Sequence, residues 1–434
     1  MKRYKKRILI CLMVLIAVVL CLVLTLVLRR EKIDCNSYIE GKDHQYMFYN
    51  EAGMCTVQAR GNKGTFLSIK NYIYFIEDGT KEAVPLCNKV DCLHDKETEE
   101  NKKKQCNAYM EAFLMEVDPI NIAYNDGYVY YIDQLSDELY GKQVLYRLSE
   151  DGSQKEKIYE WENPEVQCWC LHRDVLYYVN VAYALPDGEN ADSANVYSLK
   201  KLELNSFFKK PKDIYSGDEQ LNIYSVGYLK AYGNYVYFRV YGNTAEDESL
   251  LTEENAHMYV YNEMIVYDII NENYYELDLM DNERNEEASL VTFYNDRLII
   301  SSYSKDDNSD LANIYIADLD GKNQEILWKD IQASTRIHSD GKYLYTSNAV
   351  RIMNGKDELP VVLNVYNKEF EMTDTFSFPW FYWGQIGASD YLYIYINSDN
   401  KQNLEVVRFD KSEIGFLNGK EMEYQKVLEI PLDK

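Results

Sequence analysis

The sequence predicts an all-β fold, a seven-bladed β-propeller preceded by one N-terminal transmembrane helix. A turn followed by a Tyr-rich alternating strand recurs seven times, the copies lie 46 to 62 residues apart, and one uncharged apolar run lies near the N-terminus. All-strand repeats near 50 residues are typical of propellers, in which each blade is one small sheet. Six or eight blades are alternatives. The copies span residues 71–75, 126–131, 174–178, 233–238, 295–300, 340–345 and 389–394.

The apolar run at residues 8–28 contains no charged residue and, at 1.5 Å per residue, spans roughly 31 Å, about one hydrocarbon core. It exceeds the usual core of a signal peptide and lacks a small-residue cleavage site. Cys21 follows a bulky Leu20 and fits a lipoprotein cleavage site poorly. The run therefore predicts a retained signal anchor. Basic residues in the segment 1–7 predict a cytoplasmic tail and a single-pass protein of the cell membrane with an extracellular C-terminal domain.

After the anchor, residues 29–65 are interpreted as a juxtamembrane stalk and lead-in, in which 46–49 is a candidate strand for closing the ring. The propeller is predicted over 66–434, with a Cys/His insert at 86–109. Later strands are predicted within the repeats, and Asp-Gly pairs between them are hairpin signals because Gly tolerates positive φ. They are residues 143–148 and 155–161 in the second unit, 313–317 and 324–328 in the fifth, and 404–409 and 425–430 in the seventh.

The formal net charge of −25 excludes nucleic acid and anionic lipid as expected partners, since an acidic field repels both. The sequence contains no Gly-x-Ser-x-Gly, His-Glu-x-x-His, phosphate loop or dinucleotide fingerprint. Paired carboxylates for glycoside cleavage stay open, because 71 acidic residues prevent a choice among them. The sequence therefore favours a non-enzyme without deciding the question.

The densest group of metal-ligating side chains is Cys87, Cys92, His94 and Cys106, spaced Cys-x4-Cys-x-His-x11-Cys. Three thiolates and one imidazole are a tetrahedral zinc set in kind, so one structural zinc is a candidate cofactor. A disulfide among these cysteines is the competing interpretation, because thiols outside the membrane tend to be oxidised. Either interpretation makes the group structural.

A second group is Cys168, Cys170 and His172, which share one face if this segment is a strand. Steps of about 6.6 Å along a strand are too long for a comfortable bond between the two sulfurs. Buried reduced thiols are the simplest interpretation. A bridge to Cys35 or Cys55 and a metal triad are the alternatives.

An aromatic run at 378–384 lies between the sixth and seventh repeats. Connections between blades lie near the central channel, so Trp380, Tyr382 and Trp383 are candidates for stacking on a sugar ring or a peptide. The alternative is that these rings fill the interface between blades.

The insert and the Tyr-rich repeats together resemble a group of uncharacterised clostridial-type cell-surface propellers. Their first-blade insert is similar to Leu-Cys-Asn-Lys-x-Asp-Cys-x-His, and the resemblance covers essentially the whole region after the anchor. The strand repeats are also similar to TolB-type and lipoprotein-receptor-type propellers. The resemblance implies a surface location in a Gram-positive bacterium and a binding or sensing role, and it brings no catalytic residues. The insert matches at Leu86, Cys87, Asn88, Lys89, Asp91, Cys92 and His94.

The sequence thus predicts a membrane-anchored extracellular propeller that binds or senses a protein or glycan ligand. A glycan-cleaving hydrolase or lyase is one alternative, and a scaffold subunit of a membrane complex is another. A polar pocket with two catalytic carboxylates would favour the enzyme. A broad apolar patch on the blade edges would favour the scaffold.

Overall fold

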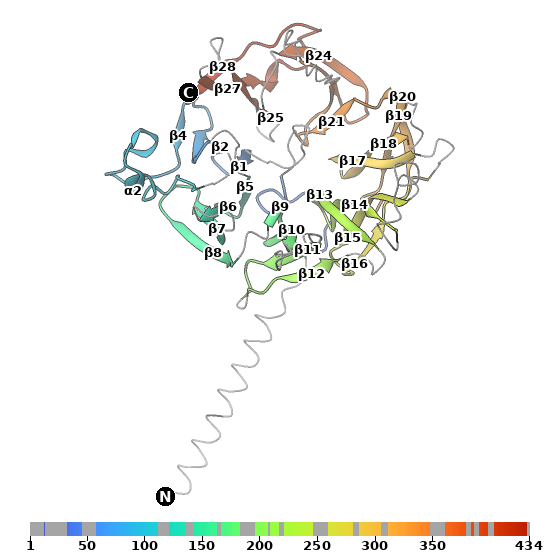
Figure 1. Cartoon of the computed structure of the whole chain (residues 1–434). Helices are drawn as coiled ribbons and strands as arrows, with labels where there is room; N and C mark the ends of the chain where they lie inside the picture. Colours follow the sequence, from blue (N-terminus) through green and yellow to red (C-terminus); the bar gives the residue numbers. More distant parts are fainter. Residues whose placement is uncertain are drawn as a thin grey trace, which may run out of the picture. The chain divides into compact units, whose positions relative to one another are not determined.

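Seven four-stranded sheets follow one another along the chain in the computed structural model, which describes residues 13, 33–45, 58–111, 121–135, 142–162, 166–182, 196–206, 209–216, 221–245, 259–280, 286–304, 311–347, 361–378, 383–385, 390–397 and 403–431. Every pair of neighbouring strands within a sheet is antiparallel. Figure 1 shows the sheets arranged in chain order around one axis. The seven-bladed propeller predicted from the repeats is confirmed.

The strands of the first four sheets have the following bounds. The first sheet consists of β1 (Gln58–Arg60), β2 (Gly64–Ile69), β3 (Tyr72–Glu77) and β4 (Ala83–Pro85). The second consists of β5 (Ile122–Asn125), β6 (Tyr128–Leu135), β7 (Lys142–Ser149) and β8 (Lys155–Trp161). The third consists of β9 (Val166–His172), β10 (Val175–Ala182), β11 (Val196–Glu203) and β12 (Lys212–Tyr215), and the fourth of β13 (Asn222–Tyr232), β14 (Tyr235–Asn243), β15 (Val260–Asp268) and β16 (Asn273–Glu276).

The remaining sheets complete the ring. The fifth consists of β17 (Glu286–Tyr294), β18 (Arg297–Ser304), β19 (Leu311–Ala317) and β20 (Glu325–Gln332), and the sixth of β21 (Arg336–Ser339), β22 (Leu344–Ser347), β23 (Val361–Tyr366) and β24 (Met372–Phe378). The seventh consists of β25 (Trp383–Gln385), β26 (Tyr391–Asn397), β27 (Asn403–Asp410) and β28 (Gln425–Pro431). Among the residues that the structure describes, three short helices accompany them, namely η1 (His94–Lys96), α2 (Glu100–Lys103) and η4 (Lys411–Glu413).

The chain divides into two compact units, residues 1–35 and residues 36–434. Apart from Met13, the predicted anchor at 8–28 lies outside the described residues, as does the candidate closing strand at 46–49. No helix among the residues that the structure describes is long and apolar enough to cross a membrane. The first blade already contains β1, so the propeller begins earlier than the predicted boundary at residue 66.

Six of the seven repeats fall on the second strand of their blade, but the first repeat, 71–75, falls on the third strand, β3. The repeated pattern therefore marks the tight turn of a hairpin and not a fixed strand of the blade. In the first blade this turn joins β2 to β3, and Lys70 within it takes a positive φ of 48°. In the other blades the same pattern begins at the turn between the first two strands. At Asp126 and Gly127 both φ values are positive, 49° and 87°, which matches the right-handed twist of the flanking strands.

Tyrosine and aliphatic side chains fill the spaces between blades, as the alternating strands predict. The ring closes because the seventh blade packs on the first, where Tyr395 and Val406 join the same apolar cluster as Phe66 and Tyr74. Gln58 Nε2 also donates to the carbonyl of Tyr393 at 3.0 Å. The four described strands of the seventh blade, within residues 383–431, form a sheet separate from that of the first blade. The ring is therefore closed by packing between two sheets and not by a strand shared between them.

Residues 36–45 lie against the turns between the first and second strands of the second to fourth blades. Asp126 N–H donates to Gly41 O at 2.8 Å, and Arg173 Nε donates to Asp43 Oδ1 at 2.7 Å. The Asp43 carboxylate is fully buried, so this charge-assisted contact satisfies a group that would otherwise be costly to bury. The segment therefore fastens three blades at one end of the ring.

His44 of this segment and His172 of β9 are both buried. His172 Nδ1 accepts the His44 N–H at 3.1 Å, and His172 Nε2 donates to Gly233 O at 2.8 Å, so the ring is neutral. Burial lowers the pKa of His172 to about 4, and burial together with the nearby His172 and Lys230 lowers the pKa of His44 to about 3. Both side chains favour the neutral form in the folded state.

Acidification from pH 7 to pH 5 is expected to destabilise residues 36–434, and His172→Gln is expected to lose less stability over this range. Above about 6.5 neither state protonates these histidines, whereas below it the unfolded chain binds protons that the folded chain excludes. The free energy of unfolding should fall by about 1.4 kcal/mol per pH unit for each histidine until the lowered pKa is reached. Urea denaturation at several pH values measures this slope, and equal slopes in both proteins would contradict the assignment.

Candidate metal centre and adjoining cleft

The first blade carries an insert that extends from the end of β4 to residue 111, and Figure 1 shows its helix α2 at the outer edge of the ring. The insert brings together Cys87, Cys92, His94 and Cys106. One donor atom from each residue lies within 4.8 Å of the other three. The sequence prediction that these four residues form one group is confirmed.

The distances fit a metal site rather than a disulfide. Cys87, Cys92 and Cys106 are free thiols, and Cys106 Sγ lies 3.7 Å from His94 Nδ1. Ligands bound tetrahedrally to zinc lie roughly 3.3–3.8 Å apart, since the metal–ligand distances are about 2.0–2.3 Å. A disulfide would bring two sulfurs to about 2.05 Å and leave the third without a role. The donor set therefore fits one tetrahedral ion.

The local backbone places the donors on separate short turns. Cys92 N–H donates to Lys89 O at 3.3 Å, which closes a turn between the first two cysteines. His94 takes a positive φ of 55° at the start of η1. Cys106 N–H donates to Lys103 O at 2.9 Å just after α2. These turns direct the four side chains toward one point, and an isolated antiparallel bridge between Tyr109 and Tyr72 joins the end of the insert to β3.

The middle of the insert has little apolar burial to hold it, whereas its ends, at Leu86 and at residues 108–110, are buried in the core of the first blade. No residue of η1 or α2 is buried. Tyrosines of the first blade provide polar anchors instead: Tyr72 OH donates to His94 O at 3.1 Å, and Tyr74 OH donates to Asp95 Oδ2 at 3.2 Å. A metal ion bound at the cluster would supply a cross-link for this middle part.

The thiols differ in their electrostatics. Burial raises the pKa of the Cys87 thiol, but hydrogen bonds from the backbone N–H groups of Lys89 and Asn107 and from the other two thiols outweigh it, so this pKa lies below its usual value. Burial and the neighbouring Cys87 raise the pKa of Cys106. A metal ion is bound by thiolates, so metal binding would release the protons that the thiols carry.

Lys155 of β8 joins the second blade to the insert. Its Nζ donates to Tyr109 O at 2.7 Å and lies 4.9 Å from the centre of the Tyr146 ring. Burial lowers the pKa of Lys155, and the charges of Asp133, Glu111 and Cys106 oppose that shift. Three thiolates around a divalent ion leave one net negative charge, so a buried ammonium is a suitable counter-ion. Sequence reasoning missed this residue, because it is distant from the cysteines along the chain.

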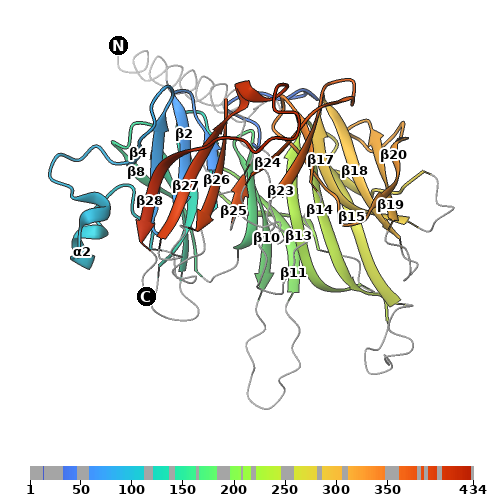
Figure 2. The same ribbon diagram turned by 90° about the horizontal axis from the view of Figure 1, so that it is seen from above.

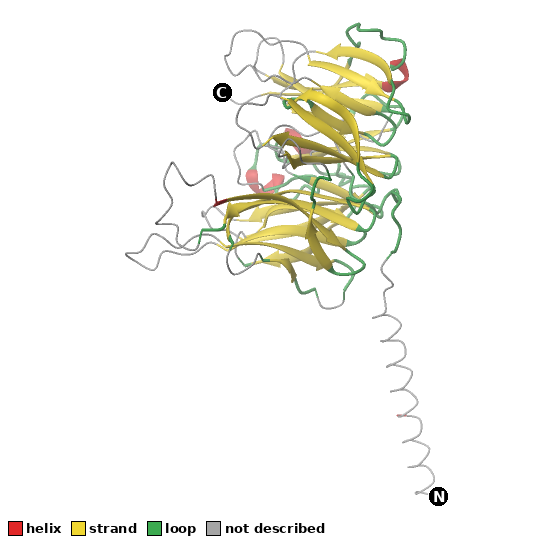
Figure 3. Cartoon of the chain, turned by 90° about the vertical axis from the view of Figure 1, so that its right-hand side faces the viewer, coloured by secondary structure: helices red, strands yellow, loops and turns green. Residues whose placement is uncertain are grey.

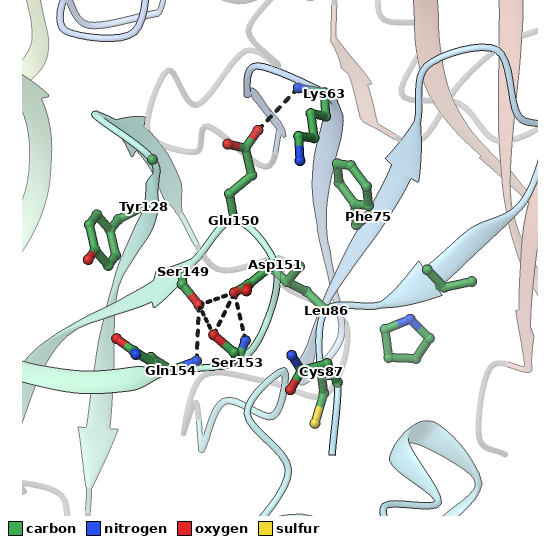
Figure 4. Close-up of a pocket in the computed structure, with 14 residues that line it drawn as sticks. Lys63, Phe75, Leu86, Cys87, Tyr128, Ser149, Glu150, Asp151, Ser153 and Gln154 are labelled. Carbon is green, nitrogen blue, oxygen red and sulfur yellow. Dashed lines mark hydrogen bonds between the residues drawn. The ribbon is translucent and has the colours of Figure 1, made fainter. Parts of the chain in front are cut away.

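A cleft of about 730 Å³ adjoins the cluster between the first two blades (Figure 4). One side is lined by residues from Val84 to Asn88, which run from β4 into the insert. The other side is lined by the β7–β8 turn and its neighbours, from Ser149 to Gln154. Gly152 lies so close to the insert that an added Cβ would be 2.8 Å from the Cys87 nitrogen. Asn107 Nδ2 donates to Gly152 O at 2.8 Å. The position of the metal site therefore sets the width of the cleft.

Both carboxylates of the cleft are engaged in turn hydrogen bonds. Asp151 accepts from the hydroxyls of Ser149 and Ser153 at 2.6 and 2.7 Å, which lowers its pKa to about 2. Glu150 accepts from Lys63 N–H at 3.1 Å and from Tyr124 OH at 3.2 Å. A glycosidase needs a carboxylic acid with a raised pKa beside a free carboxylate. The described lining of this cleft does not have that arrangement.

The other candidate residues fall elsewhere. Cys168, Cys170 and His172 lie on β9 and are all buried, and the two cysteines are thiols packed between the third and fourth blades. Trp380 and Tyr382 lie outside the described residues, and Trp383 begins β25, with its side chain likewise outside the description.

No protein-family model and no curated protein matches this chain. Prolyl oligopeptidase B from Galerina marginata, solved with a macrocyclization substrate, has a TM-score of 0.50 at 10% identity, over 91% of this chain and 52% of that chain. An oligogalacturonate lyase from Vibrio parahaemolyticus has a TM-score of 0.46 at 13% identity, over 83% and 89% of the two chains. A TolB protein from Agrobacterium tumefaciens has a TM-score of 0.34 at 10% identity, over 68% and 91%.

At these identities the likeness shows the propeller fold alone. This chain spans about half the length of prolyl oligopeptidase B. Propellers host many unrelated activities, so function has to be argued from the site.

The purified protein is expected to bind about one equivalent of zinc, and Cys106→Ser is expected to lose it because three donors hold the ion far less tightly. Cys170→Ser is the matched control, since this buried cysteine lies outside the cluster, and it should keep the metal even if its stability falls. Elemental analysis with thiol titration measures both. A metal-free protein whose cluster cysteines resist thiol reagents until they are reduced would contradict the prediction.

Proposed function

We propose that this chain is a membrane-tethered, extracellular propeller that binds a glycan in the cleft between its first two blades. The observation that carries this proposal is the composition of the cleft. Phe75 and Tyr128 offer aromatic faces, while Ser153, Gln154 and Lys63 offer hydrogen-bonding groups. Figure 4 shows the two rings on either side of the 149–154 turn. A pocket with a few polar groups among apolar walls is typical of binding sites for small ligands.

Sugar rings suit this lining, because their C–H faces stack on aromatic rings and their hydroxyls pair with amides and hydroxyls. Tyr128 is held in place by Arg147, whose Cζ lies 4.2 Å from the ring centre. The hydrogen bonds already made by Glu150 and Asp151 favour binding over cleavage. Zinc in the cluster of Cys87 and its partners would hold the insert side of the cleft in position.

Tethering rests on the sequence. The uncharged run at 8–28 has the length of one membrane crossing, and the basic residues before it favour a cytoplasmic N-terminus. Resemblance of the insert to clostridial-type surface propellers supports a location on the outside of a Gram-positive cell. These features give the propeller the role of a surface receptor or sensor.

Replacing Gln154 by Ala is expected to weaken glycan binding by about 2- to 10-fold, the usual effect of one lost hydrogen bond. Gln332→Ala is the control, because Gln332 is an exposed glutamine on β20, far along the chain from the cleft. A glycan array with residues 36–434, followed by calorimetry on the best ligand, provides the affinities. Absence of any glycan ligand, or equal affinities in both variants, would refute the proposed site.

Deleting residues 1–30 is expected to move the protein from the membrane fraction to the medium or the soluble fraction, because the deletion removes the only long apolar run of the sequence. The intact chain should resist alkaline carbonate extraction and should retain its first residues on N-terminal sequencing. Recovery of a mature form that starts beyond residue 28 would show that the run is cleaved.

A further inference from the structure

A second cleft, of about 280 Å³, lies between the third and fourth blades, away from the metal centre and the glycan cleft. Tyrosines dominate its lining. Tyr215 comes from the end of β12, and Tyr261 and Tyr274 come from β15 and β16. Leu221, Ile265 and Glu276 also line this cleft.

Strand register places Tyr261 and Tyr274 of the fourth blade on one face. Ile265 pairs with Glu276, and Tyr267 pairs with Tyr274. Directly paired residues share a face, as do residues two apart along a strand. Tyr261, Ile265, Tyr274 and Glu276 therefore all face the third blade.

The rings form an angular enclosure rather than a flat stack. The centroids of Tyr215 and Tyr274 lie 4.9 Å apart with the ring planes at 79°. Tyr215 is buried at the base, with 5% of its surface exposed, whereas Tyr274 is 44% exposed at the rim. Nearly perpendicular aromatic walls present both ring faces and ring edges to a small guest.

Glu276 supplies a negative charge at this enclosure. Tyr261 OH donates to Glu276 Oε1 at 2.7 Å, which orients the carboxylate. Among the residues that the structure describes, no lysine or arginine forms an ion pair with Glu276. Lys201, which belongs to the third blade, pairs with Glu272 at 2.9 Å instead.

We propose that this cleft binds an organic quaternary ammonium group. A cation over aromatic faces is attracted by the negative ring faces, and a quaternary ammonium needs no hydrogen-bond acceptors of its own. A primary ammonium is more strongly hydrated, so it gives up more of its hydration on entering an aromatic enclosure. The net charge of −25 adds a long-range attraction for cations. The site is independent of the glycan cleft, because it lies between different blades.

Choline is the probe, titrated by calorimetry into the full chain in a maltoside detergent. Its uncharged carbon isostere, 3,3-dimethylbutanol, tests the need for charge, and butylamine tests the preference for a quaternary over a primary ammonium. Choline is expected to bind with saturation, and both comparison ligands are expected to bind at least about fivefold more weakly.

Variants then locate the site. Tyr274→Ala and Glu276→Gln are expected to weaken choline binding by about 3- to 10-fold, while Tyr274→Phe keeps the aromatic face and keeps the affinity. Tyr424→Ala is the matched control, because Tyr424 is equally exposed, at 44%, on another blade, and it should bind choline as the unaltered chain does. Equal binding of the isostere, tighter binding of butylamine, or unchanged affinity in both Tyr274→Ala and Glu276→Gln would overturn the proposal.

Discussion

Each blade of this propeller depends on its two neighbours, because both faces of a sheet carry large buried side chains. Tyr131, Tyr178, Tyr237, Tyr345 and Tyr395 are almost completely buried, and each lies on a different blade. Exposing such a face would place extensive apolar surface in water, at a cost of about 25 cal/mol per Å². The ring must therefore close, and packing of the seventh blade on the first achieves this.

The insert on the first blade is held in place differently from the blades. No residue of its two short helices is buried, so the packing that holds the blades reaches the ends of the insert, at Leu86 and at residues 106–110, but not these helices. A metal ion bound by the four donor atoms, which lie within 4.8 Å of one another, would supply a cross-link there. Because Gly152 and Asn107 join the insert to the second blade, the order imposed by the cluster extends into the cleft. Metal binding in the insert would therefore be coupled to the proposed ligand binding in the cleft.

Much of the fold followed from local sequence signals. The alternating tyrosines and the hairpin turns located strands such as β7, β8 and β28 closely, since both signals act within a few residues. The strand that each repeat occupies within its blade was not predicted; the first repeat falls on the third strand, β3, because β2 lacks the tyrosines that mark the second strand elsewhere. The Cys/His group was predictable because its ligands are close in sequence. Lys155, the Asp43–Arg173 pair and the tyrosines of the second cleft were not, because each depends on contacts between distant segments.

We infer that a metal ion bound at the cluster holds the insert against the second blade and so shapes the cleft. Hydrogen exchange can be measured by mass spectrometry before and after removal of metal with a strong chelator. After removal, exchange should become faster in residues 84–111 and in the turn 149–154, with the third to sixth blades unchanged. Identical exchange in both samples, or a uniform increase around the whole ring, would contradict it.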